Sequence, residues 1–374
     1  MRILHIVDIK NPKGNGVAIA VENYLKYESQ KENVALYNLG TDFKIDGVQT
    51  FLISKYNKLS LLPDNFDKPD LIIFNEVYKI KYTSLYKECL KRKIPYVVIP
   101  HGCLVKKAQS KKKLKKIIAN LLLFNRFLRK ASLIQFLNEE EMKNSKKVNK
   151  NYIISGNGIA KINRQNEYKN KDFIYIGRYD IKVKGLDLLV NMCLKNKTWF
   201  LENNVKIKLY GRTAGNGYLE LKNMISKNNL EKVILLNDAV YGKEKEKILS
   251  DSYCFIQVSR HEGQPMGIME ALGYGLPCIV TYGTTFGNYV SEKKCGIGIN
   301  FSSEELFVAI QKLYTDVELR NSFHENSKCI YNDYGWDENI SKLLKEYSKV
   351  AKRWYCVNSF ITNFIYTSFI CLYS

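Results

Sequence analysis

The chain has 374 residues, of which 45% are hydrophobic, and its 58 basic and 37 acidic side chains give a formal net charge of +21. This length favours two domains with sizeable cores, and the charge indicates an anionic partner such as nucleic acid, a membrane surface or a phosphorylated substrate. The nine cysteines are odd in number and include no C-x-x-C pair. They exclude a disulfide framework and a cysteine metal cluster, and they indicate reduced thiols in a cytosol.

The positive charge is concentrated in the first half of the chain. Residues up to Asn157 include 29 basic and 14 acidic side chains, a net charge of +15, against +6 for the remainder. The opening MRILHIVDI does not have the form of a signal peptide, and no stretch offers the ~18 or more apolar residues of a spanning helix. Residues 357–374 come nearest, but polar side chains interrupt them. We expect a poorly packed or surface-lying tail there.

Strand-length apolar runs alternate with helix-like segments along the chain. The runs are RILHIV (2–7), LIIF (71–74), YVVIP (96–100), LIQFL (133–137), FIYIG (173–177), VKIKLYG (205–211), KVILL (232–236), YCFIQVS (253–259) and CIVT (278–281). The helix-like segments are 185–194, 217–228, 243–251 and 304–314. Runs that are apolar throughout are typical of parallel strands buried on both faces. The pattern predicts two doubly wound α/β domains facing each other across a cleft, with a linker near 150–170 and domains at 1–157 and 158–332.

Two segments of the first domain follow its strands directly, where such sheets bind ligands. The segment KNPKGNGVAIAVENYL (10–25) holds Gly14 and Gly16, which let a ligand approach the backbone at the start of a helix. A tight turn would explain them equally well. His101 and Gly102 follow the strand at 96–100, and this histidine is either a hydrogen-bonding partner of a ligand or a structural residue.

A lysine run follows His101. Seven lysines lie between Lys106 and Lys116, and Leu114, Ile117, Ile118, Leu121 and Leu122 recur at helical spacing. A solvated helix face is one interpretation. A basic, partly apolar helix is also the kind that rests on an anionic membrane surface.

In the second domain, the segment GRYDIKVKGLDLLV (177–190) joins a strand to a helix that we expect to start near Gly185. Arg178 and Lys184 flank this loop. Two cations at a helix N-terminus form a site for a diphosphate, although both could be ordinary surface charges.

Two carboxylates surround a small-residue turn in RHEGQPMGIMEALGYGLP (260–277). Glu262 lies in the loop after a strand, and Glu270 lies in a helix whose first turn we expect to include Pro265. Gly267 gives room for close approach. Carboxylates accept charge-assisted hydrogen bonds from vicinal hydroxyls, so this turn suits a nucleotide-linked sugar.

The run SRHEGQPMGIMEALGYGLPCIVT (259–281) resembles the E-x7-E segment of retaining glycosyltransferases of family 4, which have the GT-B fold. GRYDIKVKG (177–185) is similar to the G-R-x-x-x-x-K-G diphosphate loop of that family, ISGNG (154–158) to the Asn-Gly that opens its second domain, and PHG (100–102) to its active-site His-Gly. YGWDENISKLLKEYSKV (334–350) resembles its terminal helices, which cross back to the first domain. The resemblance implies such a helix at 333–354 and leaves an apolar tail at 355–374. Gln264 and Pro265 stand where Phe-Gly is commoner.

The resemblance implies a role for each candidate residue. Glu270 would bind the ribose, Glu262 the donor sugar near its anomeric centre, and Arg178 and Lys184 the departing diphosphate. Backbone N–H groups around Gly267 and Ile268 would add charge stabilisation. From the first domain, the acceptor-binding one, His101, Gly14 and Gly16 would face the same ligand.

The resemblance therefore implies a hexosyltransferase that uses a UDP- or GDP-sugar and acts with retention on a saccharide acceptor. No D-x-D triplet occurs in the chain, so we expect no metal and no other cofactor. A lipid-linked acceptor in O-antigen, lipopolysaccharide or capsule synthesis is our hypothesis, with the protein cytoplasmic and peripheral on the inner membrane. A GT-B nucleotide-sugar 2-epimerase is one alternative. A basic nucleic-acid-binding protein is another, although no recognisable nucleic-acid module accompanies the charge.

Overall fold

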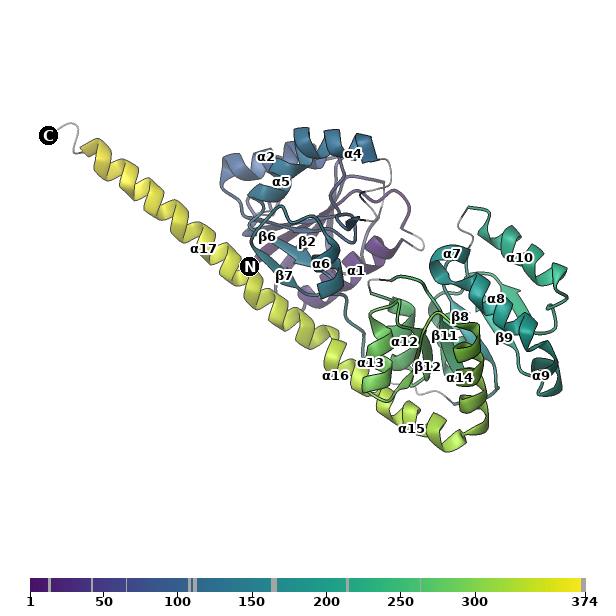
Figure 1. Ribbon diagram of the computed structural model, residues 1–374. Helices are drawn as coiled ribbons and strands as arrows, with labels where there is room; N and C mark the ends of the chain where they lie inside the picture. The colour runs from purple at the N-terminus through teal and green to yellow at the C-terminus, as the bar shows by residue number, and fades with distance from the viewer. Residues whose placement is uncertain are drawn as a thin grey trace. The chain divides into compact units, whose positions relative to one another are not determined.

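The computed structural model describes residues 1–12, 15–41, 43–64, 66–106, 109, 113–162, 167–212, 215–262 and 264–370, with the backbone alone for 113–115 and 354–370. Two compact units emerge (Figure 1). Unit 1 comprises Met1–Asn157 together with the chain from Trp336 onward, and unit 2 comprises Gly158–Gly335. No helix in the described part of the chain is both long enough and apolar enough to cross a bilayer.

Unit 1 is built on a seven-stranded sheet with the strand order β3-β2-β1-β4-β5-β6-β7, and all its strand pairs are parallel. The strands are β1 (Arg2–Val7), β2 (Asn33–Asn38), β3 (Gln49–Leu52), β4 (Leu71–Asn75), β5 (Tyr96–Ile99), β6 (Leu133–Phe136) and β7 (Tyr152–Ile154). Because β4 and β5 are buried along their whole length, helices must cover both faces of the sheet.

One face of this sheet packs against α1 (Gly16–Glu28) and the long α17 (Trp336–Ile370). Trp336 lies at the start of α17 and contacts Tyr24 and Tyr27 of α1, with ring centroids 5.0 Å and 5.7 Å apart. Trp336 and Tyr347 thus anchor the returning chain to unit 1, because both aromatic side chains are buried there.

The opposite face packs against α2 (Tyr82–Arg92) and α5 (Asn125–Lys130) (Figure 1). Helix α5 continues directly from α4 (Lys113–Ala119), and a single π-turn, η2 (Asn120–Phe124), joins the two. The remaining described elements of this unit are the short helices η1 (Leu59–Leu61) and α6 (Glu139–Asn144).

Unit 2 has a six-stranded parallel sheet in the order β10-β9-β8-β11-β12-β13. Its strands are β8 (Phe173–Ile176), β9 (Ile207–Tyr210), β10 (Ile234–Asn237), β11 (Cys254–Gln257), β12 (Cys278–Thr281) and β13 (Gly296–Ile299). Its helices are α7 (Ile181–Lys184), α8 (Leu186–Lys195), α9 (Lys197–Glu202), α10 (Gly217–Lys227), α11 (Gly242–Asp251), α12 (Met266–Gly273), α13 (Phe286–Glu292), α14 (Ser303–Thr315), α15 (Val317–Ser327) and α16 (Cys329–Tyr334).

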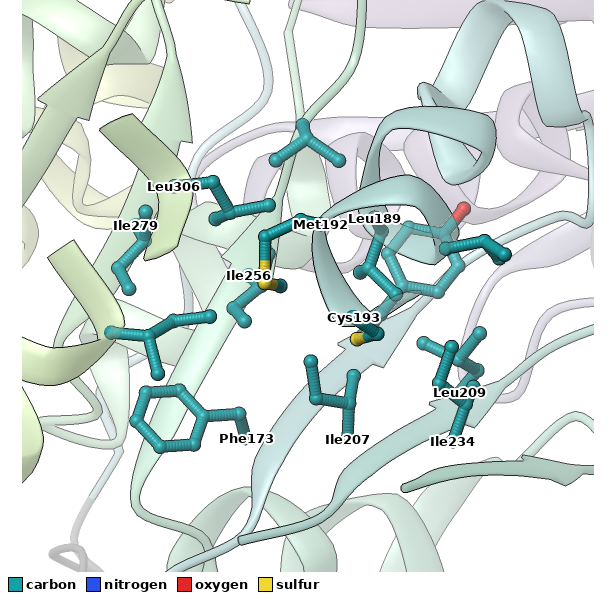
Figure 2. Close-up of a cluster of buried hydrophobic side chains, with 14 of the residues drawn as sticks. Phe173, Leu189, Met192, Cys193, Ile207, Leu209, Ile234, Ile256, Ile279 and Leu306 are labelled. Carbon is teal, nitrogen blue, oxygen red and sulfur yellow. The ribbon is translucent and has the colours of Figure 1, made fainter. Parts of the chain in front are cut away.

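The larger core of unit 2 lies between the sheet and α8, α10 and α14. Figure 2 shows Leu189 and Met192 of α8 above Ile207 and Ile256 of the sheet, and all four side chains are buried. The other face is covered by α12, α13 and α16, whose apolar residues form a second buried cluster. Each sheet is thus the middle layer of a three-layer α/β unit, and the predicted pair of doubly wound Rossmann-like domains is confirmed.

The nine predicted strand runs coincide with strands of the structure, and the sequence patterns missed β2, β3, β7 and β13. The four predicted helices correspond to α8, α10, α11 and α14. The prediction for Pro265 was wrong by one position. Pro265 has an extended backbone and caps α12, which begins at Met266.

Candidate active site

The strand order of unit 2 reverses between β8 and β11. The chain runs from β8 outward through β9 and β10, and it then returns to the other side of β8 to continue through β11, β12 and β13. In parallel α/β sheets, ligands bind beyond the carboxyl ends of the strands at such a reversal. Arg178 lies in the loop after β8, Lys184 ends the short helix α7 that follows this loop, and Glu262 lies in the loop after β11. The fold therefore brings three predicted site residues to one edge of one sheet.

Lys184 is the last residue of a short helix that an aspartate caps at its start and a glycine ends. Asp180 caps α7 by accepting a hydrogen bond of 3.1 Å from the N–H of Val183. Gly185 ends α7 with a φ of +68°, and a Cβ there would lie 1.9 Å from the carbonyl oxygen of Val258. Only glycine fits both requirements, so the chain passes close to β11 at this point. The Lys184 side chain, 13% exposed, is held beside the strand end.

Glu262 binds two partners, one with each carboxylate oxygen. Its Oε1 forms an ion pair with the Nζ of Lys184, and its Oε2 accepts a hydrogen bond from the Nε2 of Gln257 in β11. Its backbone N–H donates to the carbonyl of Gly283, at 3.3 Å. These contacts fix the carboxylate, 16% exposed, at the edge of the sheet.

The electrostatics of this cluster lower the pKa of Lys184. Burial is the main cause, the positive charge of Arg178 adds to it, and Asp180 opposes it, giving a pKa of about 8. Arg178 itself is exposed. Two cations thus lie close enough to repel each other, and an anion that bound both would relieve that repulsion.

The second carboxylate, Glu270, lies in α12 and forms an ion pair through its Oε2 with Lys245 of α11. Gly267 occupies the second position of α12, where a Cβ would lie 3.1 Å from the ring of Phe255. The side chain of Ile268 is fully buried, and its N–H donates to the carbonyl of Pro265 at 3.0 Å. A ligand bond to that N–H would have to replace this contact.

His101 lies in unit 1 at the end of a buried polar chain. Its Nε2 is 3.1 Å from the Oδ1 of Asn75, at the end of β4. The Nδ2 of Asn75 is 3.4 Å from the Nδ1 of His5, and the Nε2 of His5 is 2.8 Å from the Oε2 of Glu28. His5, Asn75 and Glu28 are fully buried. The chain connects α1 with the carboxyl ends of β1, β4 and β5.

The backbone after β5 is constrained around His101. His101 and Gly102 have φ values of 49° and 78°, and the N–H of Gly102 donates to the Oε1 of Glu141 at 2.6 Å. Burial, with a smaller contribution from His5, lowers the pKa of His101 to about 4. His101 is therefore a neutral imidazole near pH 7, and it can exchange hydrogen bonds with a ligand without carrying charge.

The glycine segment after β1 is described in part. Gly16 is the first residue of α1, and the side chain of Asn15 caps this helix by accepting from the N–H of Val17 at 3.0 Å. A Cβ at Gly16 would have no neighbour within 4 Å, so one side of the residue is open. Gly14 lies outside the described residues, as do Lys107, Lys111 and Lys112 of the lysine run.

The sequence patterns did not single out Gln257, Lys245, Asn75 or Glu28, although each contacts a candidate residue or extends its network. The signal available for Gln257 and Asn75 is a polar side chain at the last position of an apolar strand. Lys245 and Glu28 give no such signal, because their contacts form only in the folded unit.

The protein family described as "Glycosyl transferases group 1" matches residues 159–329 of this chain. An uncharacterised glycosyltransferase of Haemophilus influenzae is 26% identical over 209 residues, which cover 54% of this chain and 53% of the relative. The chain thus matches about half the length of that curated relative. The family match includes Arg178, Lys184, Glu262 and Glu270.

Several solved glycosyltransferases share the fold. Anabaena HepE, crystallised with UDP and glucose, superposes with a TM-score of 0.73 at 14% identity, covering 93% of this chain and 99% of that one. A glycosyltransferase from Rickettsia africae gives a TM-score of 0.73 at 14% identity, covering 94% and 98%. These likenesses establish the GT-B fold of the chain, and residues 159–329 add a match to the glycosyltransferase group 1 family.

Proposed function

We propose that the protein is a retaining glycosyltransferase of family 4 that moves a hexose from a UDP- or GDP-sugar to a saccharide acceptor. The observation that carries this proposal is the cluster of Arg178, Lys184 and Glu262 at the strand reversal of unit 2. It combines two neighbouring cations with a carboxylate held in an ion pair, inside the segment that matches the glycosyltransferase family. HepE, which shares the fold, was crystallised with UDP, and this supports a nucleotide-sugar donor.

The reaction needs stabilisation of a departing diphosphate. Negative charge develops on this group as its bond to the sugar breaks, and preorganised cations lower the energy of that state. Arg178 and Lys184 would supply these cations, and the N–H groups at Gly267 and Ile268, at the start of α12, would add to their field. We expect no metal to be required, because the two side chains take over charge neutralisation.

Donor binding would change the partner of Lys184. The Nζ of Lys184 now contacts Glu262, and a diphosphate would compete for it. Release of this ion pair would leave the Oε1 of Glu262 available for a sugar hydroxyl near the anomeric centre, while Gln257 still holds its Oε2. The carboxylate of Glu270 would accept hydrogen bonds from the ribose hydroxyls. Unit 1 would contribute His101 and the segment with Gly14 and Gly16 to substrate binding.

A lipid-linked saccharide in O-antigen, lipopolysaccharide or capsule synthesis is the acceptor that we propose. Two proteins with the same fold are named for such roles: WaaG, involved in lipopolysaccharide biosynthesis, and WaaB, a lipopolysaccharide outer core galactosyltransferase. The first half of the chain carries a net charge of +15. Such a domain is attracted to an anionic surface, so we place the protein on the cytoplasmic face of the inner membrane.

The enzymatic proposal is tested with a panel of UDP- and GDP-sugars. Proton NMR would follow release of the nucleoside diphosphate and the anomeric configuration of the first product formed. We expect one donor to be consumed with retained configuration, and EDTA to leave most of the activity intact. An inverted product would contradict retention, a complete loss restored by Mg²⁺ or Mn²⁺ would contradict the metal-free mechanism, and no turnover of any donor would contradict the function.

The membrane proposal is tested with vesicles. We expect the protein to sediment with vesicles containing anionic lipid, to be released by high salt, and to stay in solution with neutral vesicles. Replacement of Lys111, Lys112, Lys113, Lys115 and Lys116 by glutamate should abolish sedimentation. Binding that persists in high salt would contradict electrostatic attachment and would point to residues 357–374.

A further inference from the structure

We propose that a cationic pocket of unit 1, lined by Lys106, Lys116 and Lys146, binds the phosphate of a lipid-linked molecule. This rests on the proposed function, since it locates the charged group of the acceptor. The pocket also includes Leu104, Gln109, Ile117 and Asn120, and its volume is about 390 Å³. That volume falls within the ~300–1,000 Å³ of ordinary small-ligand sites. None of these lining residues is acidic.

Lys106 and Lys116 come from the lysine run, and Lys146 follows α6. A β-bridge joins Val105 to Ser145, and the N–H of Lys146 donates to the carbonyl of Leu104 at 3.1 Å. This bridge places Lys106 and Lys146 in one pocket although they are distant in sequence. The Nζ of Lys146 also donates to the Oδ1 of Asn125 at 3.2 Å. Tertiary structure, and not the sequence run alone, therefore gathers the charge.

The third lysine is held over an aromatic ring. The Nζ of Lys116 lies 5.3 Å from the centroid of Tyr78. The hydroxyl of Tyr78 is 2.9 Å from the Oε1 of Gln109 and 3.0 Å from the Oδ1 of Asn120. The Nδ2 of Asn120 donates to Gln109 at 3.2 Å, and the Nε2 of Gln109 donates to the carbonyl of Cys103 at 2.6 Å. These bonds fix the polar wall of the pocket, so it is preorganised for a ligand.

The helix that lines the pocket contains a π-turn, which is a second and independent sign of function. Asn120 begins this turn and is 6% exposed, with its amide in the pocket wall. π-turns inside α-helices are rare and concentrate at functional sites.

The same helix explains why the phosphate should belong to a lipid. Ile117, Ile118, Leu121 and Leu122 are 51%, 58%, 75% and 70% exposed. Four large aliphatic side chains exposed on one helix face form an apolar patch that a free phosphate would leave in water. An amphiphile would place its phosphate among the lysines and its chain along this patch, and Ile117 belongs to both surfaces.

The probe is octyl phosphate below its micelle concentration, with inorganic phosphate as the second ligand, and calorimetry measures binding to the whole protein. Each lysine offers a charge-assisted contact, so we expect Lys146→Ala and Lys106→Ala each to weaken octyl phosphate binding about tenfold. Lys147→Ala is the matched control, because Lys147 is exposed beside Lys146 but does not line this pocket. It should bind as the wild type does.

Ile117→Ser separates the two ligands. We expect it to weaken octyl phosphate binding and to leave inorganic phosphate binding unchanged. Equal affinity of the wild type for both ligands would overturn the lipid assignment. Octyl phosphate binding that survives in both lysine variants would overturn the pocket, and so would an oligonucleotide that competes with octyl phosphate at equal affinity.

Hydrolysis of nucleotide sugars by the wild-type protein, measured in parallel, separates this proposal from the proposed function. Octyl phosphate binding without sugar turnover would support the pocket and contradict the glycosyltransferase function alone. Turnover without octyl phosphate binding would contradict the pocket alone.

Discussion

The two sheets have closely similar strand orders, yet different chemistry gathers at the ends of their central strands. In unit 2, β8 and β11 lead to an ionic cluster in which Lys184 pairs with Glu262. In unit 1, β1, β4 and β5 lead to the hydrogen-bonded chain of His5, Asn75 and His101. One topology thus presents paired ionic side chains for a charged ligand on one unit and a neutral imidazole on the other. The difference teaches that strand order fixes where a site forms, while the last residues of each strand decide what it can bind.

The largest expected effect comes from removing one cation of the unit 2 cluster. Lys184→Met should lower turnover by about 2–4 kcal/mol of barrier, because the departing diphosphate loses a fixed charge. Steady-state kinetics with the donor identified by the panel would measure it. Lys182→Met is the matched control, since Lys182 is an exposed lysine of the same short helix. If the two variants lost equal activity, the ionic cluster would not be the reacting site.

A smaller effect is expected from Gln257, which acts on Glu262 and not on the substrate. Gln257→Met keeps the side-chain length but deletes the hydrogen bond to Oε2 of Glu262. Bonds to charged groups contribute about 1.5–3 kcal/mol, so kcat should fall by roughly tenfold or more, with a smaller change in donor KM. We do not expect Gln257→Asn to keep the wild-type kcat, because the shorter asparagine side chain does not reach Oε2 of Glu262. An unchanged kcat would show that Glu262 needs no such support.

The pH dependence distinguishes the ionic cluster from the neutral chain. The pKa of Lys184 is about 8, below the usual value of a lysine. Below this pH Lys184 is a cation, and above it the charge is lost, so kcat/KM should fall by up to about tenfold per unit as pH rises beyond 8. Lys184→Arg should flatten this alkaline limb, because arginine stays charged. An identical alkaline limb in that variant would assign it to another group.

The smallest effect concerns the stability of unit 1. The pKa of His101 is about 4, below its usual value near 6.5, so the folded state binds fewer protons between these values. Stability is fully present above pH 6.5 and declines as pH falls toward 4. Between pH 7 and pH 5 we expect His101 to account for about 1–2 kcal/mol of this decline. Asparagine tolerates the positive φ at this position.

Melting temperatures of the wild type and His101→Asn, measured at both pH values, would test this expectation. The loss of melting temperature on acidification should be smaller in His101→Asn. If His101→Asn and the wild type lost the same melting temperature on acidification, protonation of His101 would not contribute to the acid sensitivity of the protein.

The sequence predicted the fold class and the edges of the sheets because buried parallel strands are apolar throughout. The sequence patterns missed β2 and β7 because the residues that flank these strands are rich in Asn, Lys and Ser. No helix-length pattern marks where these two strands begin and end. The residue types of the ionic cluster were also predictable, since Arg178, Lys184 and Glu262 lie in the connections that follow β8 and β11. Their mutual contacts were not. The pairing of Lys184 with Glu262 depends on how closely Gly185 lets the loop approach Val258, which is a property of packing.

The return of α17 to unit 1 sets the order in which the chain can complete its fold during synthesis. The ribosome synthesises the strands of unit 1 before residue 158. It synthesises the residues that cover the α1 face of this sheet much later, and these include Trp336, Ile340 and Tyr347. At ribosomal rates of about 5–20 residues per second, residues 158–335 separate the two events by roughly ten seconds or more. During that interval the face of α1 that carries Tyr24 and Tyr27 lacks its contact with Trp336. The nascent protein must therefore pass through a stage in which the strands of unit 1 have been synthesised but one face of their sheet still lacks the cover of α17.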